Sequence, residues 1–88
     1  MIKINDETTL MILNEKSYIH GILVYNDGYE YDLGRMKNGT GNFLYDSKYV
    51  YCWLFNKSMP FIYDVSERCE VTDLNQKRLI FSRYNKTL

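Results

Sequence analysis

Residues 18–33 read Tyr-Ile-His-Gly-Ile-Leu-Val-Tyr-Asn-Asp-Gly-Tyr-Glu-Tyr-Asp-Leu, and this stretch determines the expected fold class. Asn26-Asp27-Gly28 suits a three-residue hairpin loop, in which glycine takes the left-handed position. The flanking segments then pair so that Leu23 faces Tyr31 on an apolar face, while the opposite face is mixed. This division between two faces is typical of a half-buried antiparallel sheet.

A second pattern lies in residues 43–55, where the odd-numbered positions other than Ser47 are aromatic and the even-numbered ones are not. A period of two is the period of a β-strand, so we expect a hairpin around the turn Asp46-Ser47-Lys48. A three-residue loop would keep these aromatics on one face, whereas a four-residue loop would divide them between opposite faces. The set, called here the aromatic ladder, consists of Phe43, Tyr45, Tyr49, Tyr51, Trp53 and Phe55.

Short strands are also expected elsewhere, at residues 1–5, 8–13, 61–65 and 78–84, and residues 34–42 are expected to form a loop. For residues 8–13 the alternative is a helix over residues 7–16, capped by Asp6, but two threonines and an isoleucine favour a strand. Alanine, the strongest helix former, is absent from the chain. The sequence therefore predicts an all-β fold with room for one short helix. We expect a small antiparallel meander over residues 1–88, a single domain closed as a compact barrel or a two-layer sandwich.

The chain carries few of the residues that catalysis or metal binding requires. It has one histidine, His20, and two cysteines, Cys52 and Cys69, which are not spaced as zinc ligands are. A serine or cysteine nucleophile would need His20 as its base, yet His20 lies in the middle of an expected strand. Gly39-Thr40-Gly41 lacks the following lysine and helix of a phosphate-binding P-loop. We expect a protein that is not an enzyme, without catalytic residues, metal site or cofactor.

The charge and hydropathy of the chain restrict its expected function and location. The formal net charge is zero, which argues against a protein that coats DNA. The charge is uneven, because residues 1–34 carry two basic and six acidic side chains (2 − 6 = −4), while residues 74–88 carry four basic side chains and no acidic one. No segment resembles a secretory signal or a membrane span, so a cytoplasmic location is expected, in the host if a phage encodes the chain.

The favoured hypothesis is a non-enzymatic binding protein that presents an aromatic and acidic β-surface to a macromolecular partner, in the first place a protein. One interpretation of the aromatic ladder is that it forms the inner face of the barrel. The other is that it includes a binding surface, because its apolar area is large for so small a core, and tyrosine and tryptophan are enriched at interface hot spots. The same surplus predicts a homodimer. Abundant Asn, Lys, Ile, Tyr and Phe indicate AT-rich codons and favour a phage or mobile-element inhibitor of a host defence protein. The expected binding residues are Tyr45, Tyr49, Tyr51, Glu30 and Asp32.

The alternative hypothesis is a small β-barrel that binds nucleic acid or a nucleotide by aromatic stacking and basic side chains. Its expected contacts are Arg35, Lys37, Lys77, Arg78, Arg83 and Lys86. Within the aromatic ladder, Trp53 and Phe55 are expected in the core, whereas Tyr45 and Tyr49 should be exposed beside their turn.

Overall fold

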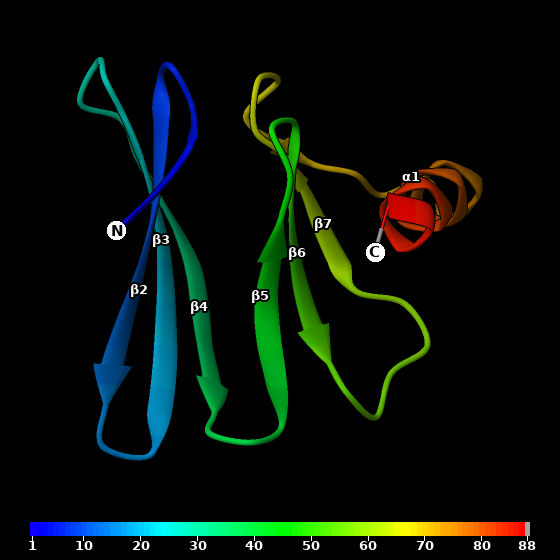
Figure 1. Ribbon diagram of the computed structural model, residues 1–88, viewed down its shortest axis with the longest axis horizontal. Coiled ribbons are helices and arrows are strands. Elements are labelled where there is room, and N and C mark those ends of the chain that lie inside the picture. Colours follow the sequence, from blue (N-terminus) through cyan, green and yellow to red (C-terminus); the bar gives the residue numbers. More distant parts are fainter. Residues whose placement is uncertain (88) are drawn as a thin grey trace.

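Two four-stranded antiparallel sheets followed by a helix make up the computed structural model, which describes residues 1–87, with side chains up to Tyr84 (Figure 1). The expected all-β class with one short helix is confirmed. Sheet A has the strand order β1-β2-β3-β4 and sheet B the order β5-β6-β7-β8. The bounds of the elements are β1 Ile2–Asn5, β2 Thr8–Glu15, β3 Tyr18–Tyr25, β4 Glu30–Lys37, β5 Gly41–Tyr45, β6 Tyr49–Leu54, β7 Phe61–Asp64, β8 Cys69–Glu70 and α1 Leu74–Thr87. Residues 8–13 are thus a strand, as predicted.

The β3–β4 hairpin forms as expected at its loop end, where Leu23 pairs with Tyr31 and Gly28 has a φ of +93°. The register then shifts by one residue, because Leu33 is an extra residue that forms a β-bulge. Oδ1 of Asp32 accepts a hydrogen bond from the N–H of Gly34 at 2.7 Å, and Gly34 has a φ of +90°, which favours glycine. Beyond the bulge β4 continues to Lys37, so the prediction of a loop from residue 34 was wrong.

The aromatic ladder is divided between two faces of sheet B. Tyr45 pairs with Val50, which leaves four residues between them instead of the expected three. The turn takes this form because Oδ1 of Asp46 accepts hydrogen bonds from the N–H groups of Lys48 and Tyr49, each at 2.8 Å. The prediction of a single aromatic face was therefore wrong, and the alternative that a longer loop divides the ladder is the one observed.

Helix α1 occupies residues that we expected to form a strand at 78–84, so that prediction was also wrong. Asp73 caps the helix, since its Oδ2 accepts a hydrogen bond from the N–H of Gln76 at 2.9 Å. Phe81 is buried, and Ile80 and Tyr84 are half-buried beside it. This spacing places the three side chains on one face of a helix, although the same residue types also favour strands.

The core lies between the two sheets, with a second apolar layer between sheet B and α1 (Figure 1). Leu23 of sheet A and Val50 of sheet B are fully buried between the sheets, where the rings of Tyr31 and Tyr63 stack with centroids 4.2 Å apart. Sheet B is thus covered on one face by sheet A and on the other by α1. In the described part of the chain, sheet A is covered only on the face toward sheet B.

Candidate binding surface

The side chains of sheet A that point away from sheet B form a surface that we call the open face. They alternate along each strand with the buried side chains, as the register of the strands requires. By this alternation the open face consists of Lys3, Thr9, Met11, Leu13, Glu15, Tyr18, His20, Ile22, Val24, Glu30, Asp32, Arg35 and Lys37.

The middle of the open face, on β2 and β3, is apolar. Leu13 is 39% exposed and Tyr18 is 47% exposed, while Met11, Ile22 and Val24 are half-buried. An antiparallel sheet with a solvated face normally carries polar side chains there, so the apolar composition of this face is unusual for a sheet exposed to water. Sequence reasoning missed these residues, although both β2 and β3 carry apolar side chains on consecutive positions and therefore on both faces.

The edge of the open face is charged, and all of its outward side chains on β4 are exposed. In chain order they are Glu30, Asp32, Arg35 and Lys37. Two of these residues were expected to bind protein and two to bind nucleic acid. The structure brings them together in a single row, with the acidic pair before the β-bulge and the basic pair after it.

A network of charged groups covers His20, which is only 6% exposed although it belongs to the open face. Nε2 of His20 lies 2.8 Å from Oδ1 of Asp32, and Nε of Arg35 donates to Oε1 of Glu15 at 2.7 Å. The hydrogen bond from His20, together with the N–H of Gly34, holds the pKa of Asp32 below its usual range. The hydrogen bond from Arg35 likewise lowers the pKa of Glu15. Both carboxylates are therefore ionised at neutral pH.

This network contains no serine, threonine or cysteine side chain. The two cysteines belong to sheet B, with Cys52 in β6 and Cys69 in β8. The imidazole of His20 is hydrogen-bonded to Asp32 within the open face. In the part of the chain that the structure describes, no group of His, Cys, Asp or Glu side chains is arranged to hold a metal ion.

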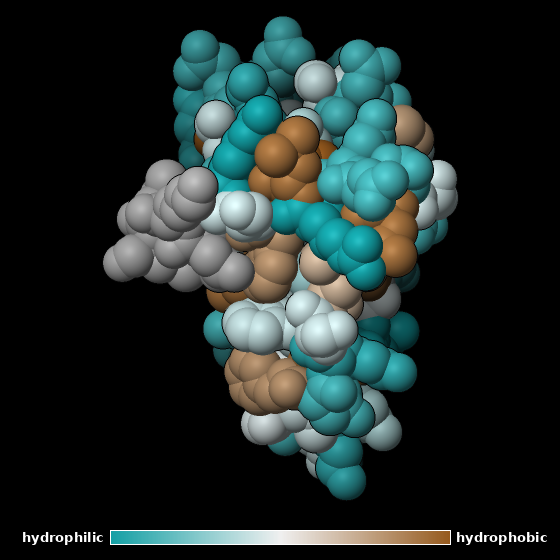
Figure 2. Space-filling model, turned by 90° about the vertical axis from the view of Figure 1, so that its right-hand side faces the viewer, coloured by the Kyte–Doolittle hydropathy of each residue, from teal (hydrophilic) through white to brown (hydrophobic). Residues whose placement is uncertain are grey.

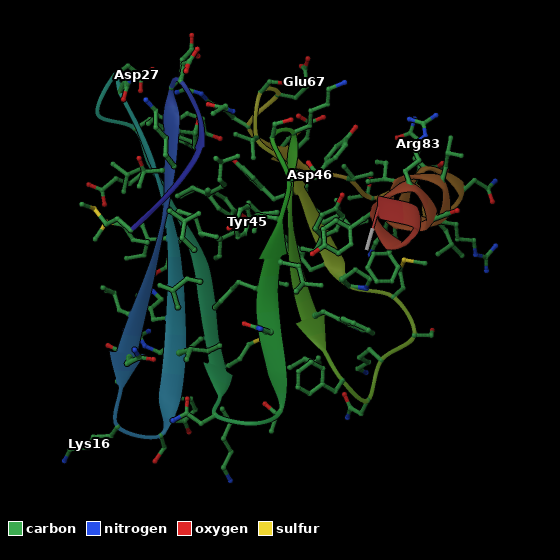
Figure 3. All side chains as sticks on the ribbon, viewed as in Figure 1. Lys16, Asp27, Tyr45, Asp46, Glu67 and Arg83 are labelled. Carbon is green, nitrogen blue, oxygen red and sulfur yellow. The ribbon has the colours of Figure 1, made fainter. Side chains whose placement is uncertain are left out.

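The three expected tyrosines lie at the other sheet and differ in accessibility. Tyr51 is fully buried, and its hydroxyl donates to Oδ2 of Asp46 at 2.7 Å. Burial and this bond to a carboxylate raise the pKa of Tyr51. Tyr49 is half-buried, whereas Tyr45 is 42% exposed near the turn that Asp46 begins (Figure 3). Tyr51 is thus part of the packing beneath α1 and is not available for contact with a partner.

A shallow hollow of about 230 Å³ lies between this turn and α1. Asp46, Lys48 and Arg83 line it together with Tyr49 and Tyr51, so that both signs of charge meet beside aromatic side chains. The helix side of the molecule shows apolar patches among hydrophilic ones (Figure 2), and Leu79 there is 54% exposed.

Trp53 and Phe55 of the aromatic ladder were both expected in the core, and for Phe55 that prediction was wrong. Phe55 is 57% exposed, because it lies beyond the last residue of β6. Trp53 is half-buried, with its ring edge-on to Phe81 of α1 at a centroid distance of 5.5 Å.

The basic residues of the alternative hypothesis do not share one groove. Arg35 and Lys37 lie on β4 of sheet A, whereas Lys77, Arg78 and Arg83 lie on α1, on the far side of sheet B (Figure 1). The side chain of Lys86 lies outside the described residues. Two separate basic clusters in different layers do not form the continuous track that a single strand of nucleic acid follows.

Comparisons with protein-family models, with curated proteins and with solved structures found no match to this chain. Among the described residues, no helix has the length and apolar character needed to cross a membrane.

Proposed function

We propose that this chain is a non-enzymatic binding protein that uses the open face of sheet A to contact another protein. The observation that carries this proposal is the apolar centre of the open face, formed by Met11, Leu13, Ile22 and Val24 and flanked by the charged row of β4. An apolar centre with a polar rim is the usual composition of a protein–protein interface.

The charges of the open face favour a protein over a nucleic acid. Glu15, Glu30 and Asp32 lie on the same face as Arg35 and Lys37. Acidic side chains at these positions would repel phosphate groups, whose neutralisation provides most of the affinity in nucleic-acid binding. A protein surface that pairs apolar side chains with charges of both signs matches this face better.

The partner is expected to lay a complementary apolar strip on β2 and β3 and to place charges against the row on β4. The abundance of amino acids with AT-rich codons favours a phage or mobile element as the source of the chain. The partner would then be a host protein that such an element needs to block. Inhibition would follow from steric occlusion, since the proposal assigns no chemistry to the chain.

Capture from a host lysate with matched surface variants tests this proposal. The proteins captured from the lysate are identified by mass spectrometry for three tagged baits, which are the wild type, Ile22→Lys and Leu79→Lys. Each capture is made with and without nuclease treatment of the lysate. Ile22 lies in the centre of the open face, and Leu79 is an exposed leucine on α1 that receives the same charge. We expect the wild type and Leu79→Lys to capture a protein that Ile22→Lys does not capture. The melting temperatures of both variants should stay close to that of the wild type.

Retention of every captured protein by Ile22→Lys, or loss of the same protein by Leu79→Lys alone, would contradict the assignment to the open face. Loss of all captured proteins after nuclease treatment would point to the nucleic-acid alternative. If Ile22→Lys lowers the melting temperature, Ile22→Thr keeps the strand propensity and repeats the test.

A further inference from the structure

Strand β4 is the longest free edge in the described chain. It is eight residues long and pairs on one side with β3, and on its other side it pairs with no strand of residues 1–87. The other edge strands, β1, β5 and β8, have four, five and two residues. A free edge presents unpaired N–H and C=O groups to any strand that can align with it. The carbonyl of Lys37 already accepts hydrogen bonds from Thr40, so at this end of the edge only the N–H and the side chain of Lys37 remain available to an added strand.

We propose that this edge pairs antiparallel with β4 of a second copy of the chain, in the register that sets Glu30 opposite Lys37 of the second copy. The two A sheets then join into one continuous sheet around a two-fold axis near Leu33 and Gly34. Such a contact is isologous, which means that the same patch serves on both copies.

The order of charges along β4 selects this partner. In the proposed register Glu30 faces Lys37 of the second copy, and Asp32 faces Arg35 of the second copy. Symmetry repeats each pair, and opposite charges directly across a strand pair stabilise it. On the inner face, Tyr31 meets Met36 of the second copy, so apolar side chains oppose each other as well.

The β-bulge at Leu33 is what allows both charged pairs to lie on one face. On a regular strand, residues separated by three positions point to opposite faces, so Asp32 and Arg35 could not both point outward. The extra residue places them on the same face, and Asp32 itself fixes the bulge through its bond to the N–H of Gly34. Bulges and charges commonly protect an edge from pairing at random. Because the charges here are sorted by sign, they repel most strands but match a second β4 that runs in the opposite direction.

The side chains beside this edge also favour an added strand. A hollow of about 320 Å³ lies along the flank of β4, with Tyr31, Leu33 and Leu54 in its walls. Side-chain exposure of 64% for Asp32 and 53% for Arg35 leaves both groups accessible, although each is already bonded within its own chain. In the dimer each would join a second partner of opposite charge. This inference uses the free edge of β4 and the charged row that also flanks the apolar centre of the open face, and it does not rest on the proposed function.

The test is a charge exchange between two variants. In a dimer of Glu30→Lys, the introduced lysine faces Lys37 of the second copy, so two positive charges meet. In a dimer of Lys37→Glu, the introduced glutamate faces Glu30 of the second copy, so two negative charges meet. Neither side chain forms an ion pair among the described residues, so we expect both variants to fold like the wild type. Sedimentation over a concentration series should show a dimer for the wild type. The dissociation constant should rise about tenfold for each variant, since two cross-strand pairs turn from opposite to like charge.

Mixing the two variants should restore the dimer. The lysine introduced at position 30 of one variant then faces the glutamate introduced at position 37 of the other, and the remaining native Glu30 and Lys37 still face each other. Glu67→Lys and Lys57→Glu, which change exposed charges on sheet B loops, serve as matched controls and should dimerise like the wild type. A wild type that stays monomeric over the whole series would overturn the proposal. So would variants that dimerise normally, or a mixture that dimerises no better than its components.

Discussion

Sheet A and sheet B have the same number of strands and the same meander order, yet they differ in how their faces are covered. In sheet B the neighbours Ile62 and Tyr63 point to opposite faces, and both are fully buried. In sheet A the neighbours Leu23 and Ile22 also point to opposite faces, but only Leu23 is fully buried. Both sheets therefore carry apolar side chains on two faces, while only sheet B has a cover for each face within the described chain.

This difference assigns different roles to similar residues. The aromatic ladder looks like a binding surface in the sequence but is largely used for packing, because α1 supplies the second cover of sheet B. The apolar centre of the open face has no such cover, so its residues are available to another molecule. Alanine substitutions on the four faces measure how large this difference is.

The largest expected effects come from Leu23, Ile62 and Tyr63, the three fully buried residues among the four neighbours named above. Leu23→Ala and Ile62→Ala should each lower the free energy of unfolding by roughly 2–5 kcal/mol, and Tyr63→Ala by a similar amount, because each change opens a cavity. Ile22→Ala should cost about 1 kcal/mol or less, because this side chain is already in contact with water. Denaturant unfolding of the four variants is the measurement. If Ile22→Ala and Leu23→Ala lower the free energy of unfolding equally, the side chains of the open face are needed for stability as much as the core is.

A tight contact between the sheets gives the next largest effect. A Cβ atom added at Gly21 would lie 2.8 Å from the ring of Phe43, so Gly21→Ala should cost about 1–3 kcal/mol. Replacing Phe43 by leucine in the same chain should return part of that loss, since it removes the atoms that collide. Chemical denaturation of both variants tests this, and an unchanged stability of Gly21→Ala would show that the sheets are less closely packed than described.

Removal of the buried Tyr51 hydroxyl beneath α1 should lower the free energy of unfolding by a similar amount. Tyr51→Phe removes a hydrogen bond to the carboxylate of Asp46, and bonds to charged groups contribute about 1.5–3 kcal/mol. Tyr45→Phe is the matched control, because Tyr45 is exposed and should tolerate the loss of its hydroxyl. Thermal melts of both variants should separate them, and equal melting temperatures would argue against the buried role of Tyr51.

The smallest effect concerns the two thiols of sheet B. Burial raises the pKa of Cys52 from 9.0 to about 12, whereas Cys69 is exposed. At pH 8 a thiol reagent should therefore modify Cys69 quickly and Cys52 only after unfolding. A raised thiol pKa also means that its contribution to stability is complete below pH 9 and is lost as the pH rises toward 12. Fast modification of both thiols in the folded protein would contradict the burial of Cys52.

The β3–β4 hairpin could be predicted from the sequence because its signals are local. Asn26-Asp27-Gly28 fixes the loop, and the alternation on both sides of it fixes the register. The β-bulge could not be read in the same way. A single extra residue at Leu33 depends on how the whole strand pairs, although Asp32-Leu33-Gly34 carries the acceptor and the glycine that the bulge needs.

The faces of the aromatic ladder and the helical state of α1 were both predicted wrongly, for different physical reasons. One residue in the turn at Asp46 decides which face each aromatic occupies, and the hydrogen bonds that fix this turn are made by one carboxylate. The helix had readable signals, a capping Asp73 and the spacing of Ile80, Phe81 and Tyr84. Strand propensity outweighed them, because it describes single residues and not the face that they form together.

Methionine oxidation in the complex with a captured partner tests most directly whether the open face is the binding surface. Met11 lies on the open face and Met59 packs on the helix side of sheet B, and both are half-buried in the free protein. We expect the partner to slow the oxidation of Met11 several-fold and to leave the rate at Met59 unchanged. An unchanged rate at Met11 together with protection of Met59 would contradict the account.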